Sequence, residues 1–365
     1  MALNCGIIGL TNTGKTTIFN CMSNTKAEAS AFAFSATKSN IGMVEVPDPR
    51  LMEIDKLIRS AKVVPATVEI VDVPGLAKGA SQGEGVGNKF LADIQQMDAL
   101  IHVLRCFDSD DLPHIEGSVD PVRDMEIVDL ELQVRDLDLV MRKIQRVEKL
   151  VKVGDKDAKK AMDVLQVYRD HFENFGNART APVSDDDRKY IQELQLLTAK
   201  PVIFVCNVDD ASATGGNPYS AAVEKALEGH HAQVIVIAGK LEAEIAELEE
   251  SDDREMFMAD AGLTEPGVNK LIRAAYERLN LQSFFTAGPK EVRAWTIKKG
   301  MTAPQASGVI HSDLERGFIR AEVMKYDDFI RFKSEQGVKD AGKFHVEGKN
   351  YIVEDGDILH IRFNV

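Results

Sequence analysis

Short runs of apolar residues recur along the first two thirds of the chain, and each is followed within two residues by a glycine or a polar side chain. The runs lie at residues 5–8, 68–71, 100–104, 201–206 and 234–237. Runs of this length are typical of buried β-strands. Because the first run leads through a glycine loop into a helix, we predict an α/β fold for this part of the chain.

Between residues 124 and 200 the spacing of apolar residues changes to that of a helix. In the first helix, apolar residues at alternating spacings of three and four predict a coiled-coil seam: Ile127, Leu130, Val134, Leu137, Met141 and Ile144. Residues 152–157 predict a turn, and the returning helix carries Ala158, Ala161, Leu165, Tyr168 and Phe172. An antiparallel hairpin of this kind either reaches a partner or packs on the domain as a strut. Its basic residues favour nucleic acid: Arg142, Lys143, Arg146, Lys149, Lys152, Lys156, Lys159 and Lys160.

The last part of the chain predicts helices over 241–260 and 265–280 and then a small sheet. Its expected strands are 292–297, 319–323, 349–353 and 358–363, with a helix near 326–336. No catalytic constellation appears there, so we expect a binding module. The predicted domains are an α/β domain (1–123 and 201–280), a helical insert (124–200) and a C-terminal α+β domain (281–365).

Charge and cysteine usage narrow the choice of compartment and partner. The 365-residue chain has a net charge of −14, which argues against broad binding of nucleic acid, but residues 281–365 carry 13 Lys/Arg against 12 Asp/Glu. The four cysteines stand singly, as expected of buried thiols in a reducing compartment. There is no long apolar run, so we expect a cytoplasmic monomer without a membrane segment.

The first apolar run ends in a phosphate-binding pattern. Gly9, Gly14, Lys15 and Thr16 match G-x-x-x-x-G-K-[ST], in which backbone N–H groups and a helix N-terminus surround phosphates. Lys15 is expected to reach the β- and γ-phosphates, and Thr16 to hold Mg²⁺. The predicted nucleotide-binding residues of this loop are Asn12, Thr13, Gly14, Lys15, Thr16 and Thr17.

The second run ends at a D-x-x-G pattern, residues 72–75. Asp72 is expected at the metal and the Gly75 N–H at the γ-phosphate, which indicates a hydrolysing switch. Residues 27–40 and 79–89 predict its mobile loops. Thr37, with Ser35 in reserve, is the candidate metal ligand of the first loop, although a plain loop hydroxyl is the alternative.

Catalysis needs a group other than the usual glutamine, because Leu76 stands at that position and cannot bind water. The Asn12 carbonyl oxygen is a candidate for holding a monovalent cation beside the phosphates. His114, in the loop after the third run, is a candidate for orienting water, although a loop histidine is more often simply solvated.

The fourth run ends at Asn207-Val208-Asp209-Asp210, where an N-K-x-D base-reading motif is expected. Asp210 keeps the carboxylate that accepts from guanine, whereas Val208 replaces the lysine that covers the base. The residues therefore leave the choice between ATP and GTP open. The loop at 238–240 is a candidate for covering the base edge.

The chain resembles the YchF branch of the Obg-like P-loop NTPases over essentially its whole length. The resemblance rests on residues 9–17, 72–87 (DVPGLAKGASQGEGVG), 105–107 and 290–320. The last of these segments resembles a TGS domain. Three positions depart from the family pattern: Asp210 where glutamate is common, Ala36 where the switch threonine is usual, and LTNTGKT in place of LPNVGKS.

The resemblance implies a Ras-like domain interrupted by a helical hairpin and followed by a TGS domain. It also implies an ATP-preferring, Mg²⁺-dependent hydrolase that associates with the ribosome. Leu76 corresponds to the family's hydrophobic substitution, Asn12 to its potassium-assisting asparagine and His114 to its histidine for hydrolysis. The alternatives are a GTP-dependent enzyme and a binding adaptor with negligible turnover. Nucleic acid is an expected partner of the insert and the TGS domain.

Overall fold

The computed structural model describes residues 3–23, 39–75, 86–230, 232–248 and 251–364. The chain forms two compact units, which we describe separately. The first contains residues 1–42 and 69–271, and the second contains residues 43–68 and 272–365. In the described part of the chain, no helix combines the length and apolar character needed to cross a lipid bilayer.

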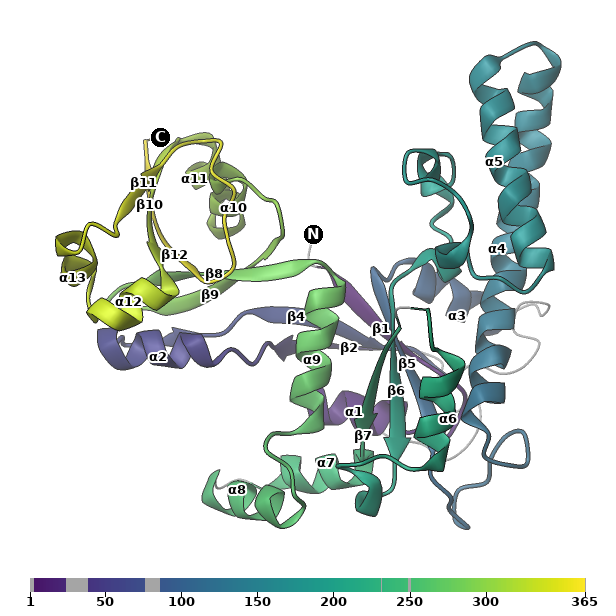
Figure 1. Ribbon diagram of the computed structural model, residues 1–365, viewed down its shortest axis with the longest axis horizontal. Helices are drawn as coiled ribbons and strands as arrows, with labels where there is room; N and C mark the ends of the chain where they lie inside the picture. Colours follow the sequence, from purple (N-terminus) through teal and green to yellow (C-terminus); the bar gives the residue numbers. More distant parts are fainter. Residues whose placement is uncertain (1–2, 24–38, 76–85, 231, 249–250, 365) are drawn as a thin grey trace. The chain divides into compact units, whose positions relative to one another are not determined.

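A six-stranded sheet with the order β2-β4-β1-β5-β6-β7 organises the first unit (Figure 1). From β4 to β7 every neighbouring pair is parallel. The strands confirm the five predicted runs and add β2: β1 (Asn4–Ile8), β2 (Asn40–Glu45), β4 (Thr67–Asp72), β5 (Ala99–Cys106), β6 (Val202–Val208) and β7 (Gln233–Ile237). The helices are α1 (Lys15–Met22), α3 (Val86–Gln95), α4 (Pro121–Lys152), α5 (Lys156–Glu173), α6 (Pro218–Ala226), α7 (Gly239–Glu247), α8 (Ser251–Asp260) and α9 (Gly267–Arg278), the last of which crosses the boundary between the units.

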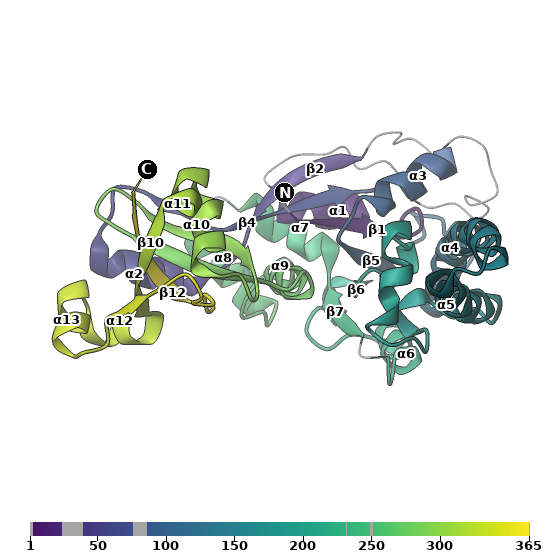
Figure 2. The ribbon, with the colours of Figure 1, turned by 90° about the horizontal axis from the view of Figure 1, so that it is seen from above.

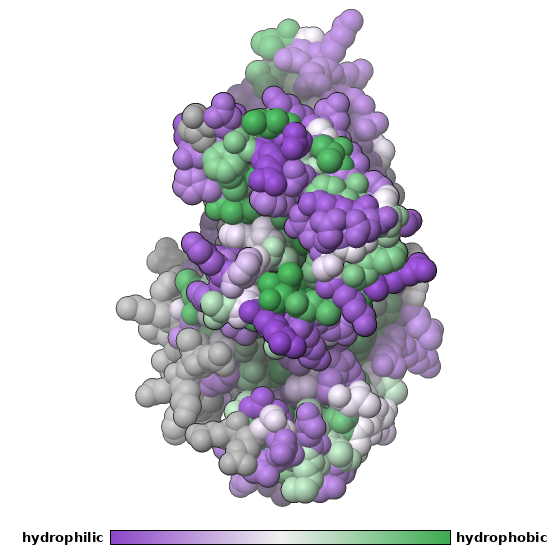
Figure 3. Space-filling view, turned by 90° about the vertical axis from the view of Figure 1, so that its left-hand side faces the viewer, coloured by the Kyte–Doolittle hydropathy of each residue, from purple (hydrophilic) through white to green (hydrophobic). Residues whose placement is uncertain are grey.

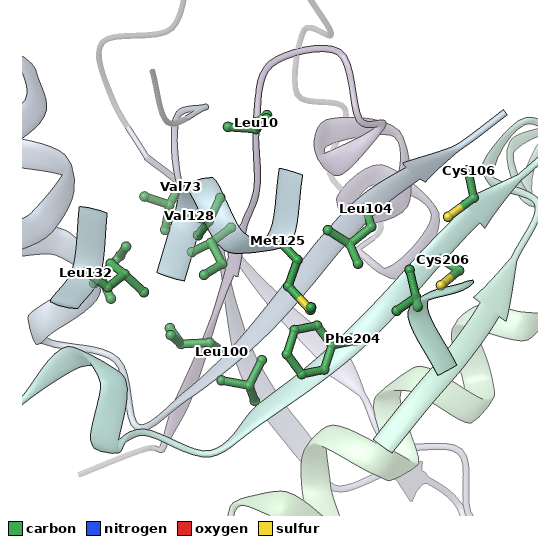
Figure 4. Packing of buried hydrophobic residues seen from close by; sticks show 14 of the residues in the cluster. Leu10, Val73, Leu100, Leu104, Cys106, Met125, Val128, Leu132, Phe204 and Cys206 are labelled. Carbon is green, nitrogen blue, oxygen red and sulfur yellow. The ribbon is translucent and has the colours of Figure 1, made fainter. Parts of the chain in front are cut away.

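The core of this unit packs the start of α4 against the middle of the sheet. Met125 and Val128 of α4 lie near Leu100, Leu104 and Phe204 of β5 and β6 (Figure 4). Burying apolar side chains of this size contributes about 1.5–3 kcal/mol each. The long helix is therefore anchored to the sheet at its N-terminal end. Of the four free cysteines, three are buried, as expected, and Cys21 is half-buried.

Helices α4 and α5 form the predicted antiparallel hairpin and lie side by side in both ribbon views (Figures 1 and 2). The predicted stripe of α5 is buried as expected. The predicted seam of α4 was partly wrong, because Leu130 and Met141 are 44% and 38% exposed. The buried stripe of α4 instead follows Val128, Leu132, Val140 and Val147.

The return from the hairpin to β6 consists of short 3₁₀ turns, namely η1 (Ala178–Thr180), η2 (Asp187–Tyr190), η3 (Gln192–Leu194) and η4 (Leu197–Ala199). Asp136 of α4 anchors them by accepting hydrogen bonds from the backbone N–H groups of Leu197 and Thr198, at 2.7 and 2.8 Å. Buried polar residues such as Asp136 interrupt the apolar stripe of α4, which shifted the seam predicted from apolar spacing alone.

The second unit is a six-stranded sheet with the order β11-β10-β12-β8-β9-β3. Its elements are α2 (Pro49–Ile58), β3 (Val63–Val64), β8 (Leu281–Ala287), β9 (Val292–Lys298), α10 (Ala303–Ile310), α11 (Ser312–Arg316), β10 (Phe318–Lys325), α12 (Tyr326–Phe332), α13 (Glu335–Asp340), β11 (His345–Glu347) and β12 (Asp357–Phe363). The surface on the side of α12 and α13 carries small hydrophobic patches among hydrophilic side chains (Figure 3).

Two predictions for this unit were wrong. Residues 349–353 form no strand apart from a single bridge at Ile352, and β11 lies earlier in the chain. The helix predicted near 326–336 is two helices, because Lys333 adopts a left-handed conformation with φ +64° and ends α12. Strand β8 and helices α10 and α11 were not predicted.

Residues 43–68 pack with the C-terminal part of the chain, although the sequence analysis assigned them to the NTPase domain. Arg50, in the first turn of α2, lies 2.8 Å from Asp48 and 2.8 Å from Asp355. Strand β3 pairs with β9, and the Tyr326 hydroxyl donates a hydrogen bond to Glu53. The compact unit therefore starts further back in the sequence than residue 281.

Candidate functional site

The predicted P-loop connects β1 to α1 and closes around Lys15. Gly14 stands directly before α1 with φ +93°, a conformation that glycine adopts without strain. The Lys15 ammonium is buried and donates a hydrogen bond to the Leu10 carbonyl at 2.6 Å. Burial lowers the pKa of Lys15 to about 8, and the nearby Asp72 charge opposes this only partly. The P-loop thus encloses the Lys15 ammonium.

Thr16 and Asp72, the two predicted metal ligands of the P-loop and the D-x-x-G motif, are in contact. The Thr16 hydroxyl donates to Asp72 Oδ2 at 2.8 Å. Asp72 Oδ1 is buried and accepts no hydrogen bond of normal geometry from the described residues. Burial raises the pKa of Asp72, although the Thr16 hydrogen bond and the Lys15 charge lower it. A buried carboxylate oxygen without a protein donor is a suitable ligand for an ion or an ordered water molecule.

Thr16 and Asp72 suit a Mg²⁺ ion that also binds phosphate, and they are too few to hold a metal ion with protein ligands alone. Among the described residues, no group of three or more His, Cys, Asp and Glu side chains is placed to hold a metal ion. Mg²⁺ typically binds through one or two protein oxygens together with phosphate oxygens. One hydroxyl and one carboxylate beside a phosphate-binding loop match that requirement.

Gly75, the glycine of the D-x-x-G motif, lies beside the P-loop. A Cβ at this position would be 3.3 Å from Lys15 Nζ and 3.0 Å from Thr11 Oγ1. The two motifs that the sequence analysis singled out therefore meet at the lysine. Ser35, Thr37 and Leu76 lie outside the described residues, as does most of the predicted loop at 79–89.

Asn207 connects three segments of the site at the end of β6. Its Nδ2 donates to the Thr13 carbonyl at 2.9 Å, and its Oδ1 accepts from the Gly239 N–H at 2.9 Å. The buried amide thereby holds the P-loop, β6 and the start of α7 together. The contact also places the end of β6, where the base motif was predicted, beside the phosphate loop.

The other two predicted base-motif residues differ in their surroundings. Val208 is 3% exposed and belongs to the hydrophobic core, so its side chain is unavailable to a ligand. Asp210 is exposed at the start of η5 (Asp210–Ser212), and the Lys240 ammonium lies 3.7 Å from its Oδ2. An accessible carboxylate at the start of η5 and an ammonium at the start of α7 therefore lie side by side.

Asn12 contacts the loop that carries His114. It adopts a left-handed backbone conformation with φ +63°, and its Nδ2 donates to the Pro113 carbonyl at 3.2 Å. The two predicted catalytic residues are thus brought close together. Nothing in the sequence suggested this contact, because 101 residues separate the bonded groups.

The side chain of His114 is buried, and both of its ring nitrogens are occupied. Nε2 lies 2.8 Å from Asp124 Oδ2, and Nδ1 accepts from the Glu116 N–H at 3.1 Å. Asp124 is itself buried, and Arg123 donates to its Oδ1 at 2.9 Å. The sequence analysis did not single out Asp124. The loop between it and His114 has no regular period, so no spacing signal could have joined the two residues.

Comparison with known proteins identifies the family. The family model described as "50S ribosome-binding GTPase" matches residues 4–143, and the YchF-GTPase_C model, described as "Protein of unknown function (DUF933)", matches residues 281–364. The "Ribosome-binding ATPase YchF" of Haemophilus ducreyi is 48% identical over 365 residues, which is 100% of both chains. The chain belongs to the YchF family.

Other YchF relatives extend this agreement. The Bacillus subtilis protein of the same name is 46% identical over 367 residues and is also covered completely. The solved "Structure of the Schizosaccharomyces pombe YchF GTPase" is 31% identical, with a TM-score of 0.87 over 99% of this chain and 98% of that chain. The expected YchF architecture, a nucleotide-binding P-loop domain with a helical region and a C-terminal α+β module, is confirmed.

Proposed function

We propose that this YchF protein is a ribosome-associated nucleotide switch that hydrolyses ATP in preference to GTP. The observation that carries the proposal is the cluster of Lys15, Thr16 and Asp72, in which a phosphate-binding lysine adjoins a half-assembled metal site. The names of the full-length relatives, "Ribosome-binding ATPase YchF", support ATP as the nucleotide and the ribosome as the partner. The solved relative is titled a GTPase, which keeps GTP as the competing substrate.

The roles of the residues follow from their chemistry. Lys15 binds the β- and γ-phosphates, the Gly75 N–H senses the γ-phosphate, and Thr16 and Asp72 hold Mg²⁺, with Thr37 as the candidate third ligand. When bound, Mg²⁺ neutralises charge on the phosphate oxygens. The Asn12 side chain would hold a K⁺ ion, which would supply positive charge beside the phosphates, and His114 orients the attacking water. Thr13, Gly14 and Thr17 complete the phosphate cradle.

The choice of base depends on Asp210 in this proposal. Its carboxylate favours guanine, whereas the adjacent Lys240 ammonium weakens that preference by competing for the carboxylate. Calorimetric titration of ATP and GTP, each with Mg²⁺, tests the preference. We expect tighter binding of ATP; equal affinity or tighter GTP binding would replace the ATP assignment with the GTP alternative.

Turnover distinguishes a hydrolase from an adaptor that only binds nucleotide. We expect phosphate release to be faster in K⁺ than in Na⁺, and to fall in His114→Ala and Asn12→Ala variants. A wild-type protein that binds nucleotide but releases no phosphate above background, with or without ribosomes, would favour the adaptor.

The hairpin is the proposed contact with ribosomal nucleic acid. Four of its exposed basic residues, Arg146, Lys149, Lys156 and Lys159, make no ion pair within the described part of the chain. Unpaired cations gain most from contact with phosphates. Reversing all four charges should abolish co-sedimentation with ribosomes. A matched Arg142→Gln variant, whose charge Asp138 already neutralises at 2.9 Å, should retain it. Unchanged binding of the fourfold variant would exclude the hairpin.

A further inference from the structure

The hydrogen bonds of His114 determine which of its nitrogens can act. The Glu116 N–H donates a hydrogen bond to His114 Nδ1, so Nδ1 acts as an acceptor and carries no proton. Neutral His114 therefore bears its proton on Nε2 and donates it to Asp124 Oδ2 at 2.8 Å. Neither nitrogen is left to contact a water molecule, and only 3% of the side chain is exposed.

The two hydrogen bonds differ in how easily they can be broken. The bond to Nδ1 belongs to a tight turn that is also closed by a hydrogen bond from the Gly117 N–H to the His114 carbonyl at 3.0 Å. Freeing Nδ1 requires that turn to change its backbone. Freeing Nε2 requires only that the loop moves away from Asp124, because Nδ1 and its donor lie on the same loop whereas Asp124 lies on α4. Nε2 is therefore the nitrogen that can become available to substrate.

Asp124 is built to hold this bond. It lies in the first turn of α4, which Asp120 caps by accepting the Arg123 N–H at 3.1 Å. Arg123 donates to Asp124 Oδ1 from Nε at 3.2 Å and from its terminal nitrogen at 2.9 Å. With Oδ1 engaged by a guanidinium, Oδ2 is left to His114. The following residue, Met125, is buried in the core, so the carboxylate stands on a rigid element.

We propose that Asp124 is a positioning residue that holds His114 out of the reaction until the loop at 107–120 moves relative to α4. The inference rests on the proposed hydrolytic function and on His114 as its water-orienting group. Asn12 of the P-loop donates a hydrogen bond to the carbonyl of Pro113, the residue before His114. A movement of Asn12 when nucleotide binds would therefore move the loop that carries His114.

Asp124→Asn tests the proposal with the smallest change, because the asparagine oxygen still accepts from Nε2 but without a charge. Charge-assisted hydrogen bonds are roughly twice as strong as neutral ones, so the weakened bond should raise the basal kcat about fivefold. KM for the nucleotide should stay unchanged. Glu126→Gln, the same substitution at an exposed carboxylate two residues along α4, is the matched control and should behave as wild type.

A double mutant shows whether Asp124 acts through His114. The kcat of Asp124→Asn/His114→Ala should equal that of His114→Ala alone. A gain in kcat that persists without the histidine would overturn the proposal, as would a lower or unchanged kcat in Asp124→Asn. If wild type itself shows no turnover, the proposed function fails instead.

A readout that is independent of turnover tests the contact itself. Nitrogen NMR of histidine-labelled full-length protein should show His114 protonated at Nε2 without nucleotide. A non-hydrolysable ATP analogue with Mg²⁺ should shift the Nε2 signal in wild type, and Asp124→Asn should resemble that state before nucleotide is added. An Nε2 signal that is the same in all three samples would overturn the proposal.

Discussion

Replacing Gly14 with alanine is the sharpest test of how the site is assembled. Gly14 has φ +93°, and a Cβ at this position would lie 2.2 Å from Asn207 Nδ2. Carbon and nitrogen atoms do not approach this closely without a bond, so the Asn207 amide has to leave its position. Its hydrogen bonds to the Thr13 carbonyl and the Gly239 N–H would break with it.

The cost follows from two contributions. Holding alanine in the left-handed region costs about 1–2 kcal/mol. Leaving a buried hydrogen-bonding group without its partner costs about 1–3 kcal/mol. Their sum is about 2–5 kcal/mol, which corresponds to at least about thirtyfold weaker binding of nucleotide if binding requires the observed loop. The backbone groups that surround the phosphates would be displaced, although no group that binds nucleotide is removed.

The assay is the dissociation constant of a fluorescent ATP analogue, with thermal unfolding recorded on the same samples. Gly154→Ala is the matched control, because Gly154 has φ +87° and nothing within 4 Å of its Cβ position. That variant should lose about 1 kcal/mol of stability from strain alone and keep wild-type affinity. A folded Gly14→Ala protein with affinity within about threefold of wild type would refute the steric argument, since threefold is well under 1 kcal/mol.

Three further variants test individual groups. His102 is fully buried in β5, and burial lowers its pKa to about 3. The stability that neutral His102 contributes above pH 6.5 is therefore lost as the pH falls. Between pH 6.5 and 5, the free energy of unfolding measured in urea should fall by about 2 kcal/mol more for wild type than for His102→Phe. Asp136 has the opposite sign, because burial outweighs its hydrogen bonds and raises its pKa to about 6. The free energy of unfolding of wild type should fall by about 2 kcal/mol between pH 3.8 and 6, and Asp136→Asn should remove that slope. Thr16→Ala should weaken nucleotide binding about tenfold in Mg²⁺ and leave binding in EDTA nearly unchanged, since the hydroxyl serves the metal; equal losses in both buffers would contradict that role.

The strands of the nucleotide-binding domain were predictable because burial on both faces leaves an uninterrupted apolar run. β5 and β6 are buried at every position, and the predicted runs fall inside them except for Pro201, which directly precedes β6. Apolar spacing was a poorer guide where polar residues are buried. In α4, Glu131, Gln133 and Asp136 occupy interior positions, so counting apolar residues placed Leu130 in a seam from which it is excluded.

For the site, the sequence identified the residues but not their contacts. Lys15, Thr16 and Asp72 were predicted from spacing and lie together, because their motifs have a fixed position at the ends of strands. The pairing of His114 with Asp124 depends on how an irregular loop returns to a helix, which no local pattern encodes. Val208 was assigned to the base from its position in the motif, whereas its side chain packs in the core because β6 is buried on both faces.

The order of the strands explains why the P-loop contacts residues at the ends of three other strands. β1, which leads into the loop, lies between β4 and β5, and β6 follows β5 in the same parallel sheet. The carboxyl ends of parallel strands meet at one edge, so a polar group after each strand comes within reach of the loop between β1 and α1. Thr16 meets Asp72 from β4, Asn12 meets Pro113 from the loop after β5, and Thr13 meets Asn207 from β6. A phosphate in the loop therefore lies beside contacts to all three strand ends. The contact after β5 leads to His114, so a displacement of the P-loop when nucleotide binds would bear on the histidine that hydrolysis is proposed to need.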